Sequence, residues 1–121
     1  MACRALVVDD SVAIRGVLMY MLRSDGFACV EASNGAEALR ALDAGEIDVV
    51  VSDLWMPGVN GLDLVKSIRS NSIHSGVPVV ILTTDVHPAR TDEAMAAGAT
   101  CVLHKPVTRE QFLAAVTSAS S

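Results

Sequence analysis

Short strand-like runs alternate with helix-like segments five times along the chain. The strand-like runs cover residues 6–8, 27–30, 48–52, 79–82 and 101–103. Apolar runs of this length, without alternation, are typical of strands buried on both faces of a sheet. After the first run, apolar residues recur at the spacing of a helix, at positions Ile14, Val17, Leu18, Met21 and Leu22.

The intervening segments carry the signals of helix ends. Residues 35–42 follow the turn-forming Asn34, and a further helix is expected to continue to about residue 97. Thr108 and Gln111 have the spacing of a capping box ahead of the last helix. Strands that are separated by helices connect in parallel through right-handed crossovers. The pattern therefore predicts an α/β fold, a doubly wound (βα)5 domain with a five-stranded parallel sheet.

Composition narrows the class of protein. The 121 residues suit one domain, and with 51% hydrophobic but only 3% aromatic residues the core must be aliphatic. The net charge is -5 and no basic cluster is present, which argues against direct nucleic-acid binding. The three cysteines form no metal-binding spacing, which favours reduced thiols in a cytoplasmic protein. No apolar stretch reaches membrane-spanning length, and Asp9 and Asp10 interrupt the first run too early for a signal peptide.

Polar side chains follow most of the predicted strands. They are Asp9 and Asp10 after the first, Asp53 after the third, Thr83 and Thr84 after the fourth and Lys105 after the fifth. In an open α/β sheet, ligands bind beyond the carboxyl ends of the strands. Glu31 follows the second strand and is expected to lie aside if that strand is at an edge. A helix-capping role for Asp10 or Ser11 would explain neither Asp9 nor the polar residues at the other strand ends.

This set of side chains fits a divalent cation and a phosphoryl group. Two carboxylates 4 Å apart repel each other by about 4 kcal/mol in a surface-like dielectric. Mg²⁺ cancels such repulsion and takes one or two carboxylates, water and phosphate oxygens as ligands. Lys105 and a threonine hydroxyl can hold further phosphoryl oxygens. Asp53 lies on a different strand from the acidic pair and is therefore the candidate nucleophile for an aspartyl phosphate.

Five segments together resemble a known family. They are VVDDS (7–11), SDLWMPGVNGLDLV (52–65), ILTT (81–84), AAGA (96–99) and HKP (104–106). The chain resembles a response regulator receiver domain over its whole length, residues 1–121, and is most similar to the single-domain chemotaxis type. The resemblance implies a flavodoxin-like sheet with the strand order 2-1-3-4-5.

The resemblance also implies roles for the acidic residues. Asp53 matches the phosphoacceptor, which takes a phosphoryl group from a phosphohistidine of a histidine kinase or of a phosphotransfer protein. Asp9 and Asp10 match the acidic pair that binds Mg²⁺ together with Asp53, and the backbone carbonyl of Trp55 matches a further ligand. The protein would then be a phosphorylation-controlled switch that catalyses its own phosphorylation and hydrolysis, without an external substrate.

The remaining matches concern switching. Thr83 matches the hydroxyl that swings toward the phosphoryl group, and Lys105 matches the lysine that pairs with it. Downstream proteins would bind the face made by the fourth helix, the fifth strand and the fifth helix. Two positions depart from the family pattern: Val102 replaces the usual aromatic residue of the fifth strand, and Thr84 stands where a smaller residue is common and could narrow phosphate access. An aliphatic β-branched side chain cannot swing a ring, so the usual coupling is in doubt.

Trp55 and Asp85 lie two residues after Asp53 and Thr83. In this family these positions flank the phosphoryl group and set how fast water removes it. We expect Trp55 to shield the acyl phosphate and Asp85 to align or repel the attacking water.

Other interpretations remain open at this stage. A haloacid-dehalogenase-like phosphatase would carry a second Asp two residues after the nucleophile, where this chain has Trp55. A nucleotide-binding module would have a glycine-rich first turn, whereas this chain has DDSVA. A degenerate receiver that only binds partners, or a receiver that is part of a longer regulator or hybrid kinase, is also possible. The initial Met and the lack of a linker favour a free-standing protein.

Overall fold

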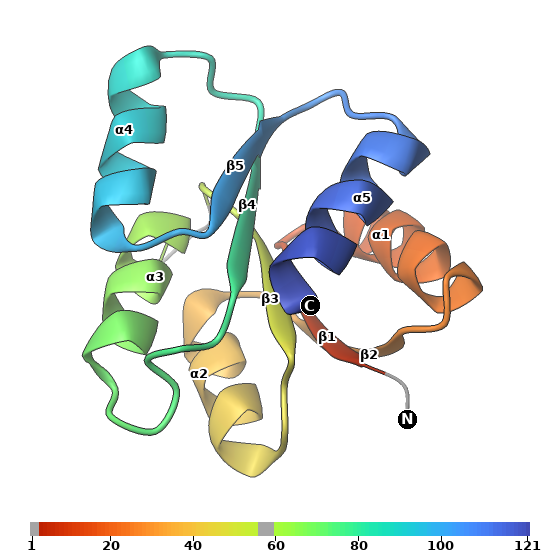
Figure 1. Ribbon diagram of the computed structural model, residues 1–121, viewed down its shortest axis with the longest axis horizontal. Coiled ribbons are helices and arrows are strands. Elements are labelled where there is room, and N and C mark those ends of the chain that lie inside the picture. Colours follow the sequence, from red (N-terminus) through yellow and green to blue (C-terminus); the bar gives the residue numbers. More distant parts are fainter. Residues whose placement is uncertain (1–2, 56–59) are drawn as a thin grey trace.

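Five parallel strands form one sheet with helices on both faces (Figure 1). The computed structural model describes residues 3–55 and 60–121, so residues 56–59 of the segment SDLWMPGVNGLDLV lie outside the described residues. The strands are β1 (Arg4–Val8), β2 (Ala28–Ala32), β3 (Val49–Asp53), β4 (Val79–Thr83) and β5 (Cys101–His104). The helices are α1 (Val12–Ser24), α2 (Gly35–Ala44), α3 (Gly61–Ser70), α4 (Pro88–Ala97) and α5 (Arg109–Ser120). The sheet order β2-β1-β3-β4-β5 confirms the predicted doubly wound α/β fold.

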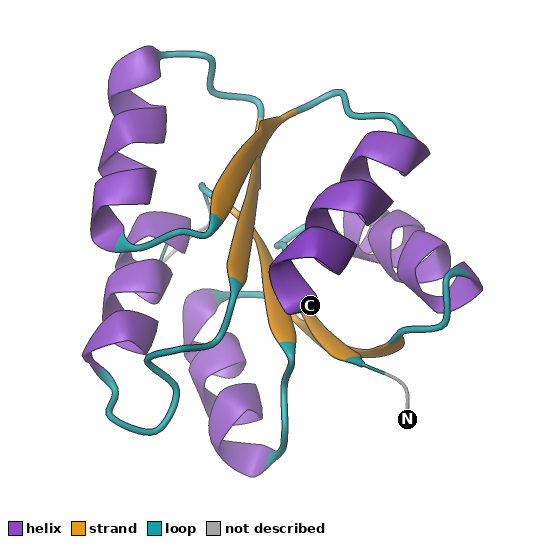
Figure 2. Cartoon of the chain, viewed as in Figure 1, coloured by secondary structure: helices purple, strands orange, loops and turns teal. Residues whose placement is uncertain are grey.

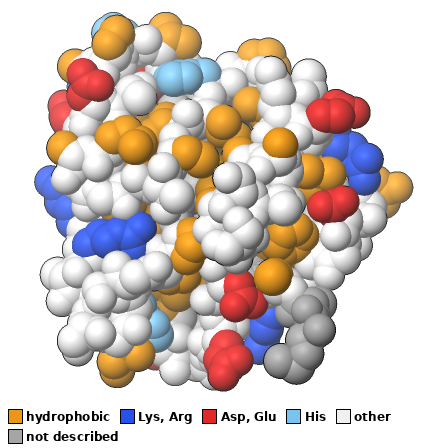
Figure 3. Space-filling model, viewed as in Figure 1, with side chains coloured by type: hydrophobic (Ala, Val, Ile, Leu, Met, Phe, Trp, Pro, Cys, Tyr) orange, Lys and Arg blue, Asp and Glu red, His pale blue; other side chains and the backbone are white. Residues whose placement is uncertain are grey.

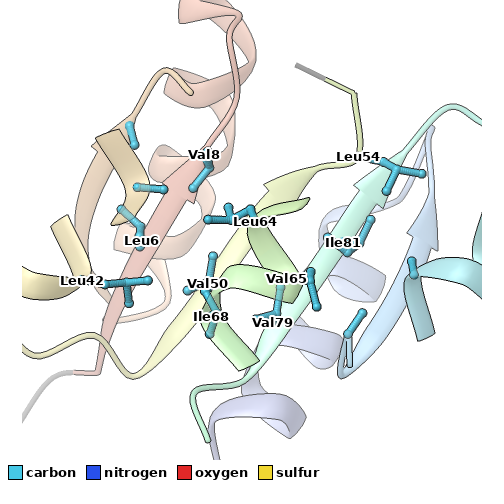
Figure 4. Packing of buried hydrophobic residues seen from close by; sticks show 14 residues of the cluster. Leu6, Val8, Leu42, Val50, Leu54, Leu64, Val65, Ile68, Val79 and Ile81 are labelled. Atoms are coloured by element: carbon cyan, nitrogen blue, oxygen red, sulfur yellow. The ribbon is translucent and has the colours of Figure 1, made fainter. Parts of the chain in front are cut away.

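Two hydrophobic clusters hold the layers together, one on each face of the sheet. Successive strand residues point to opposite faces, so Leu6 and Val8 enter one cluster while Ala5 and Val7 enter the other. The first cluster joins the sheet to α2, α3 and α4, and Figure 4 shows its central side chains. The second cluster joins the sheet to α1 and α5, with Phe112 fully buried.

Burial separates the central strands from the edge strands. In β1, β3 and β4 nearly every residue is buried, as their apolar sequences predict. The prediction of burial on both faces is wrong for β2 and β5, which form the two edges of the sheet and are only partly covered. An edge strand has a neighbour on one side only, so its side chains remain closer to solvent. Several strand ends also differ from the expected ones by one or two residues.

Side-chain caps start four of the helices. Ser11, Asn34, Asn60 and Thr108 each accept a hydrogen bond from the backbone N–H three residues later. The predicted capping box of Thr108 and Gln111 is present at the start of α5. Helix α4 instead begins with Pro88, whose fixed φ suits the first helical position.

The buried face of α1 differs from the one that the apolar spacing predicted. Ile14 and Val17 are exposed, and the side chains buried against the sheet are Arg15, Leu18, Met19 and Leu22. A periodicity analysis counts apolar residues and therefore cannot detect a buried arginine.

The loops that follow the strands gather at one edge of the sheet. Figure 2 shows the loops after β4 and β5 at the upper edge of the view. This edge collects the residues that come directly after the strands. Among the described residues, no helix is both long and apolar enough to cross a membrane.

Candidate functional site

Three carboxylates meet at the carboxyl end of the sheet. Asp9 and Asp10 directly follow β1, and Asp53 is the last residue of the neighbouring β3. One oxygen from each of the three carboxylates lies within 4.8 Å of the other two. Asp9 is buried, Asp53 is half-buried and Asp10 is exposed, so the cluster runs from the core to the surface. The structure thus brings together the acids that the sequence placed at these strand ends.

Asp9 is the most deeply buried of the three acids, and two hydrogen bonds hold it in place. Its carboxylate Oδ1 accepts a 2.9 Å hydrogen bond from the backbone N–H of Ser11, and its carbonyl accepts a 2.7 Å bond from Arg15 Nη1. Burial raises the pKa of Asp9, and the charges of Asp53 and Asp10 raise it further. The Ser11 N–H and Lys105 act in the opposite direction and lower this pKa.

Lys105 brings an ammonium group into the cluster from the strand on the far side of β4. Its Nζ lies 3.6 Å from Asp9 Oδ2 and 3.6 Å from Asp53 Oδ2. Its backbone N–H donates to the carbonyl of Thr83 at 2.7 Å, which fixes the start of the loop after β5. The peptide bond between Lys105 and Pro106 is cis. One ammonium facing three carboxylates leaves the site with an excess of negative charge.

The two threonines at the end of β4 have different surroundings. Thr83 is buried, and its Oγ1 accepts a 3.0 Å hydrogen bond from the backbone N–H of Asp85. Thr84 is exposed at the rim. Val102 in β5 is partly buried and packs against the cluster that joins the sheet to α2, α3 and α4. The aliphatic Val102 side chain therefore contributes to packing in the structure.

Trp55 connects the loop after β3 to the loop after β4. Its backbone N–H donates to Asp53 Oδ1 at 3.3 Å, and its indole Nε1 donates to Asp85 Oδ2 at 3.3 Å. Arg90 lies over the indole ring, 5.3 Å from its centroid. The other oxygen of Asp85 accepts a 2.9 Å bond from the His87 N–H and lies 3.0 Å from His87 Nδ1. These contacts of His87 lower the pKa of Asp85.

Helix α3 begins directly against the phosphoacceptor candidate. Gly61 N–H donates to the carbonyl of Leu54 at 2.9 Å, which returns the chain to the end of β3. A Cβ atom at Gly61 would lie 2.2 Å from the carbonyl oxygen of Asp53 and 2.8 Å from the Cα of Leu54. Only glycine therefore allows this approach without displacing the end of β3.

Two arginines near the site, Arg15 and Arg90, were not predicted from the sequence. Arg15 Nε pairs with Glu31 Oε1 at 3.0 Å, so Glu31 on the edge strand β2 faces α1 and not the acidic cluster, as expected. Arg15 gave no signal, because the apolar spacing of α1 indicated a different buried face. Arg90 gave no signal, because its contact with Trp55 depends on how the loop after β3 packs against the start of α4.

Comparison with known proteins identifies the family. A family model described as the response regulator receiver domain matches residues 5–117. The chain belongs to the response regulator receiver domain family. The family resemblance that the sequence motifs predicted is thereby confirmed.

Relatives of this receiver domain include chemotaxis proteins. Chemotaxis protein CheY1 of Helicobacter pylori is 39% identical over 107 residues, covering 87% of this chain and 86% of that protein. The structure of chemotaxis protein CheY4 of Vibrio cholerae superposes with a TM-score of 0.93 at 34% identity, covering 98% of this chain and 99% of that one. The DNA-binding response regulator MtrA of Mycolicibacterium paratuberculosis is 34% identical over 113 residues, covering 93% of this chain but 49% of MtrA.

The donor set of this receiver domain fits a hard divalent cation. Receiver domains typically bind Mg²⁺, and the cluster of Asp9, Asp10 and Asp53 supplies the carboxylate oxygens that Mg²⁺ prefers. Within the described parts of the chain, no other group of three or more histidine, cysteine or acidic residues has metal-binding proximity. Burial raises the pKa of Asp9, and the charges of Asp53 and Asp10 raise it further; a bound cation would favour the ionised carboxylate against both effects.

Proposed function

We propose that this receiver domain is a phosphorylation-controlled switch that accepts a phosphoryl group on Asp53. The donor is the phosphohistidine of a histidine kinase or of a phosphotransfer protein. An oxygen of Asp53 attacks phosphorus, the new O–P bond forms, and the P–N bond breaks with its electron pair left on the imidazole. The observation that carries the proposal is the position of Asp53, half-buried among two further acids and 3.6 Å from Lys105 Nζ.

The acidic cluster provides the binding site for Mg²⁺. Asp9, Asp10 and Asp53 would hold the ion through their carboxylates, and Trp55 through its backbone carbonyl. When bound, Mg²⁺ supplies positive charge that neutralises phosphoryl oxygens. The Ser11 N–H and Arg15 keep Asp9 in place for this role, because both bind it without using its second carboxylate oxygen.

Lys105 and Thr83 hold the transferred group. Lys105 Nζ already lies close to Asp53 and donates to a phosphoryl oxygen, which stabilises the charge that develops there. In the structure the Thr83 hydroxyl accepts a hydrogen bond from Asp85 N–H. This contact does not use the hydroxyl proton, which can be donated to a phosphoryl oxygen. Thr84 stands exposed at the rim and narrows access to the site. Hydrolysis by the domain itself ends the signal, and Trp55 slows this hydrolysis by limiting the approach of water.

The surface of α4, β5 and α5 is the proposed contact face for a downstream protein. Figure 3 views this face, where hydrophobic side chains lie between α4 and α5 and charged ones lie mostly toward the periphery. Met95 of α4 is exposed, and a hollow of about 310 Å³ lies between β5 and α5. We place the protein in the cytoplasm, where it acts through proteins and makes no direct contact with nucleic acid.

Phosphorylation by a small donor tests the proposal. We expect acetyl phosphate with Mg²⁺ to add one phosphoryl group to the wild-type protein, seen by intact mass, and none to Asp53→Asn. The variant Asp63→Asn is the matched control, since Asp63 is an exposed acid in the first turn of α3. Equal labelling of Asp53→Asn would contradict the assignment. No labelling of the wild type would favour the degenerate receiver, for which the replacement by Val102 is the supporting observation.

A further inference from the structure

A chain of side-chain contacts links the phosphoacceptor candidate to the start of α4. Trp55 N–H donates to Asp53 Oδ1, and the Trp55 indole reaches across to Asp85 Oδ2, each at 3.3 Å. Arg90 in the first turn of α4 covers the indole ring at 5.3 Å, and its Nε lies 3.8 Å from the same Asp85 oxygen. We call Trp55, Asp85 and Arg90 the Trp55 bridge. The bridge spans the loops after β3 and β4.

Asp85 is the centre of this bridge. Its Oδ2 faces Trp55 and Arg90, while its Oδ1 accepts from the backbone N–H of His87, the residue that precedes α4. With both oxygens engaged by protein groups, Asp85 is suited to anchor Trp55 and has little capacity left to orient a water molecule. Its side chain is only 14% exposed, which limits competition from solvent.

A second connection runs through Thr83. The buried Thr83 Oγ1 accepts the backbone N–H of Asp85 at 3.0 Å. A phosphoryl group on Asp53 would bring negatively charged oxygens to the end of β3, beside the strand that carries Thr83. If Thr83 turns its hydroxyl toward these oxygens, Asp85 N–H loses its acceptor. Phosphorylation of Asp53 would therefore alter the contacts of Asp85 both through Trp55 and through Thr83.

We propose that the Trp55 bridge couples phosphorylation of Asp53 to the start of α4, with Asp85 as the positioning residue. The inference rests on the proposed function and deepens it by naming the route of regulation. The fifth strand has the aliphatic Val102, which packs in the core and has no ring to reorient. The aromatic side chain that responds to phosphorylation is Trp55, located in the loop after Asp53. The exposed contacts of Arg90 are individually weak, so the contacts of the bridge can break when Asp85 or Trp55 moves.

Fluorescence of Trp55, the only tryptophan in the chain, and hydrogen exchange in the first turn of α4 test the bridge. The reference is the unphosphorylated protein with Mg²⁺. In the wild type, acetyl phosphate should increase quenching of Trp55 by acrylamide about twofold and speed amide exchange at the start of α4. Asp85→Ala and Arg90→Met should show the increased quenching before phosphorylation and little further change after it. Asp85→Asn keeps an acceptor for the indole and should restore part of the response.

Glu93→Gln is the matched control. Glu93 Oε1 lies 3.8 Å from Arg90 Nη1 in an exposed pair that includes neither Trp55 nor Asp85, so its variant should behave like the wild type. Intact mass measured in parallel separates the two proposals. A wild type that gains no phosphoryl group contradicts the proposed function. If Asp85→Ala and Arg90→Met are phosphorylated and still show the full wild-type change in quenching and amide exchange, the bridge is overturned and the proposed function stands. If Asp85→Ala fails to fold or to accept phosphate, Arg90→Met decides, since Arg90 lies outside the acidic cluster.

Discussion

Lys105 offsets the repulsion between the carboxylates of Asp9 and Asp53. Its ammonium lies 3.6 Å from one oxygen of Asp9 and 3.6 Å from one oxygen of Asp53, so it acts as an internal counterion for both. The same charge that stabilises these carboxylates repels a divalent cation and attracts a phosphoryl group. Lys105 therefore has opposite effects on the two ligands that the site is proposed to receive.

Replacing Lys105 separates these two effects. We expect Lys105→Met to bind Mg²⁺ more tightly by about three- to tenfold, because a positive charge near the ion is removed. The same variant should accept the phosphoryl group about 100-fold more slowly, because one donor to the phosphoryl oxygens is lost. Calorimetric titration with Mg²⁺ and intact mass over time measure the two quantities. Lys105→Arg retains the charge and should bind Mg²⁺ like the wild type; weaker binding by Lys105→Met would contradict the argument.

Single residues show what the sequence could and could not predict about the site. Asp9 and Lys105 directly follow β1 and β5, and Asp53 ends β3, so the parallel topology alone brings them to one edge of the sheet. Arg15 and Arg90 could not be predicted in this way. Their positions depend on which face of a helix packs inward and on the path of a loop, neither of which is encoded in a local pattern.

Besides the hydrophobic cluster, Arg69 links the end of α3 to the end of α4. Arg69 near the end of α3 donates from Nε to the carbonyl of Gly98 at 2.9 Å and from Nη1 to the carbonyls of Ser75 and Val77. Gly98 ends α4 with φ at 114°, a left-handed conformation, and a Cβ there would lie 2.7 Å from Arg69 Cγ. Partial burial lowers the pKa of Arg69. One guanidinium thus fixes the end of α4 and the loop before β4.

We expect Arg69→Met to destabilise the fold by about 2 kcal/mol, because three carbonyls, two of them in partly buried hydrogen bonds, lose their donor while most of the aliphatic packing is kept. Urea unfolding followed by circular dichroism measures the loss. Arg109→Met is the control, since Arg109 makes one exposed hydrogen bond to Ser24, and it should change the unfolding free energy by less than about 0.5 kcal/mol. Equal effects of the two substitutions would argue against the role given to Arg69.

At the scale of elements, the sequence was most informative where the physical signal is local. The capping box of α5 and the buried central strands were predicted because capping and burial leave marks in short segments. The partial exposure of β2 and β5 depends on strand order, which no single strand contains. For this reason the strand order came from the family resemblance.

The whole molecule carries a net charge of -5, and part of this negative charge is concentrated at one edge of the sheet. The folded state must therefore keep Asp9, Asp10 and Asp53 close together, whereas the unfolded chain lets them separate. The electrostatic repulsion among these carboxylates lowers the free energy of unfolding. The stability of the whole fold is therefore sensitive to protons and to cations that bind at the cluster.

We expect Mg²⁺ and protons to stabilise the fold in competition. The pKa of Asp9 is raised in the folded state, so without Mg²⁺ its contribution favours folding at low pH and is lost as pH rises from about 3.8 through the folded-state pKa. Mg²⁺ at 100 times its dissociation constant should add about 2.7 kcal/mol once Asp9 is ionised. Urea unfolding in EDTA and in Mg²⁺ across this pH range measures both effects.

Asp9→Asn is the matched variant for this measurement. Asn keeps an oxygen acceptor for the Ser11 N–H but does not ionise, so in EDTA the variant should lack the part of the pH dependence that Asp9 contributes. It should also be more stable than the wild type at neutral pH and gain less from Mg²⁺. Identical pH profiles of the two proteins in EDTA would show that Asp9 is not the responsible group.

Ser11 belongs both to the acidic cluster and to a helix. Its N–H binds Asp9 Oδ1 at 2.9 Å, and its hydroxyl accepts the N–H of Ile14 at the start of α1. As a helix cap alone, position 11 would accept aspartate as readily as serine. Here an aspartate would add a fourth negative charge beside Asp10, so the set of residues that can replace Ser11 during evolution narrows to uncharged caps such as threonine and asparagine.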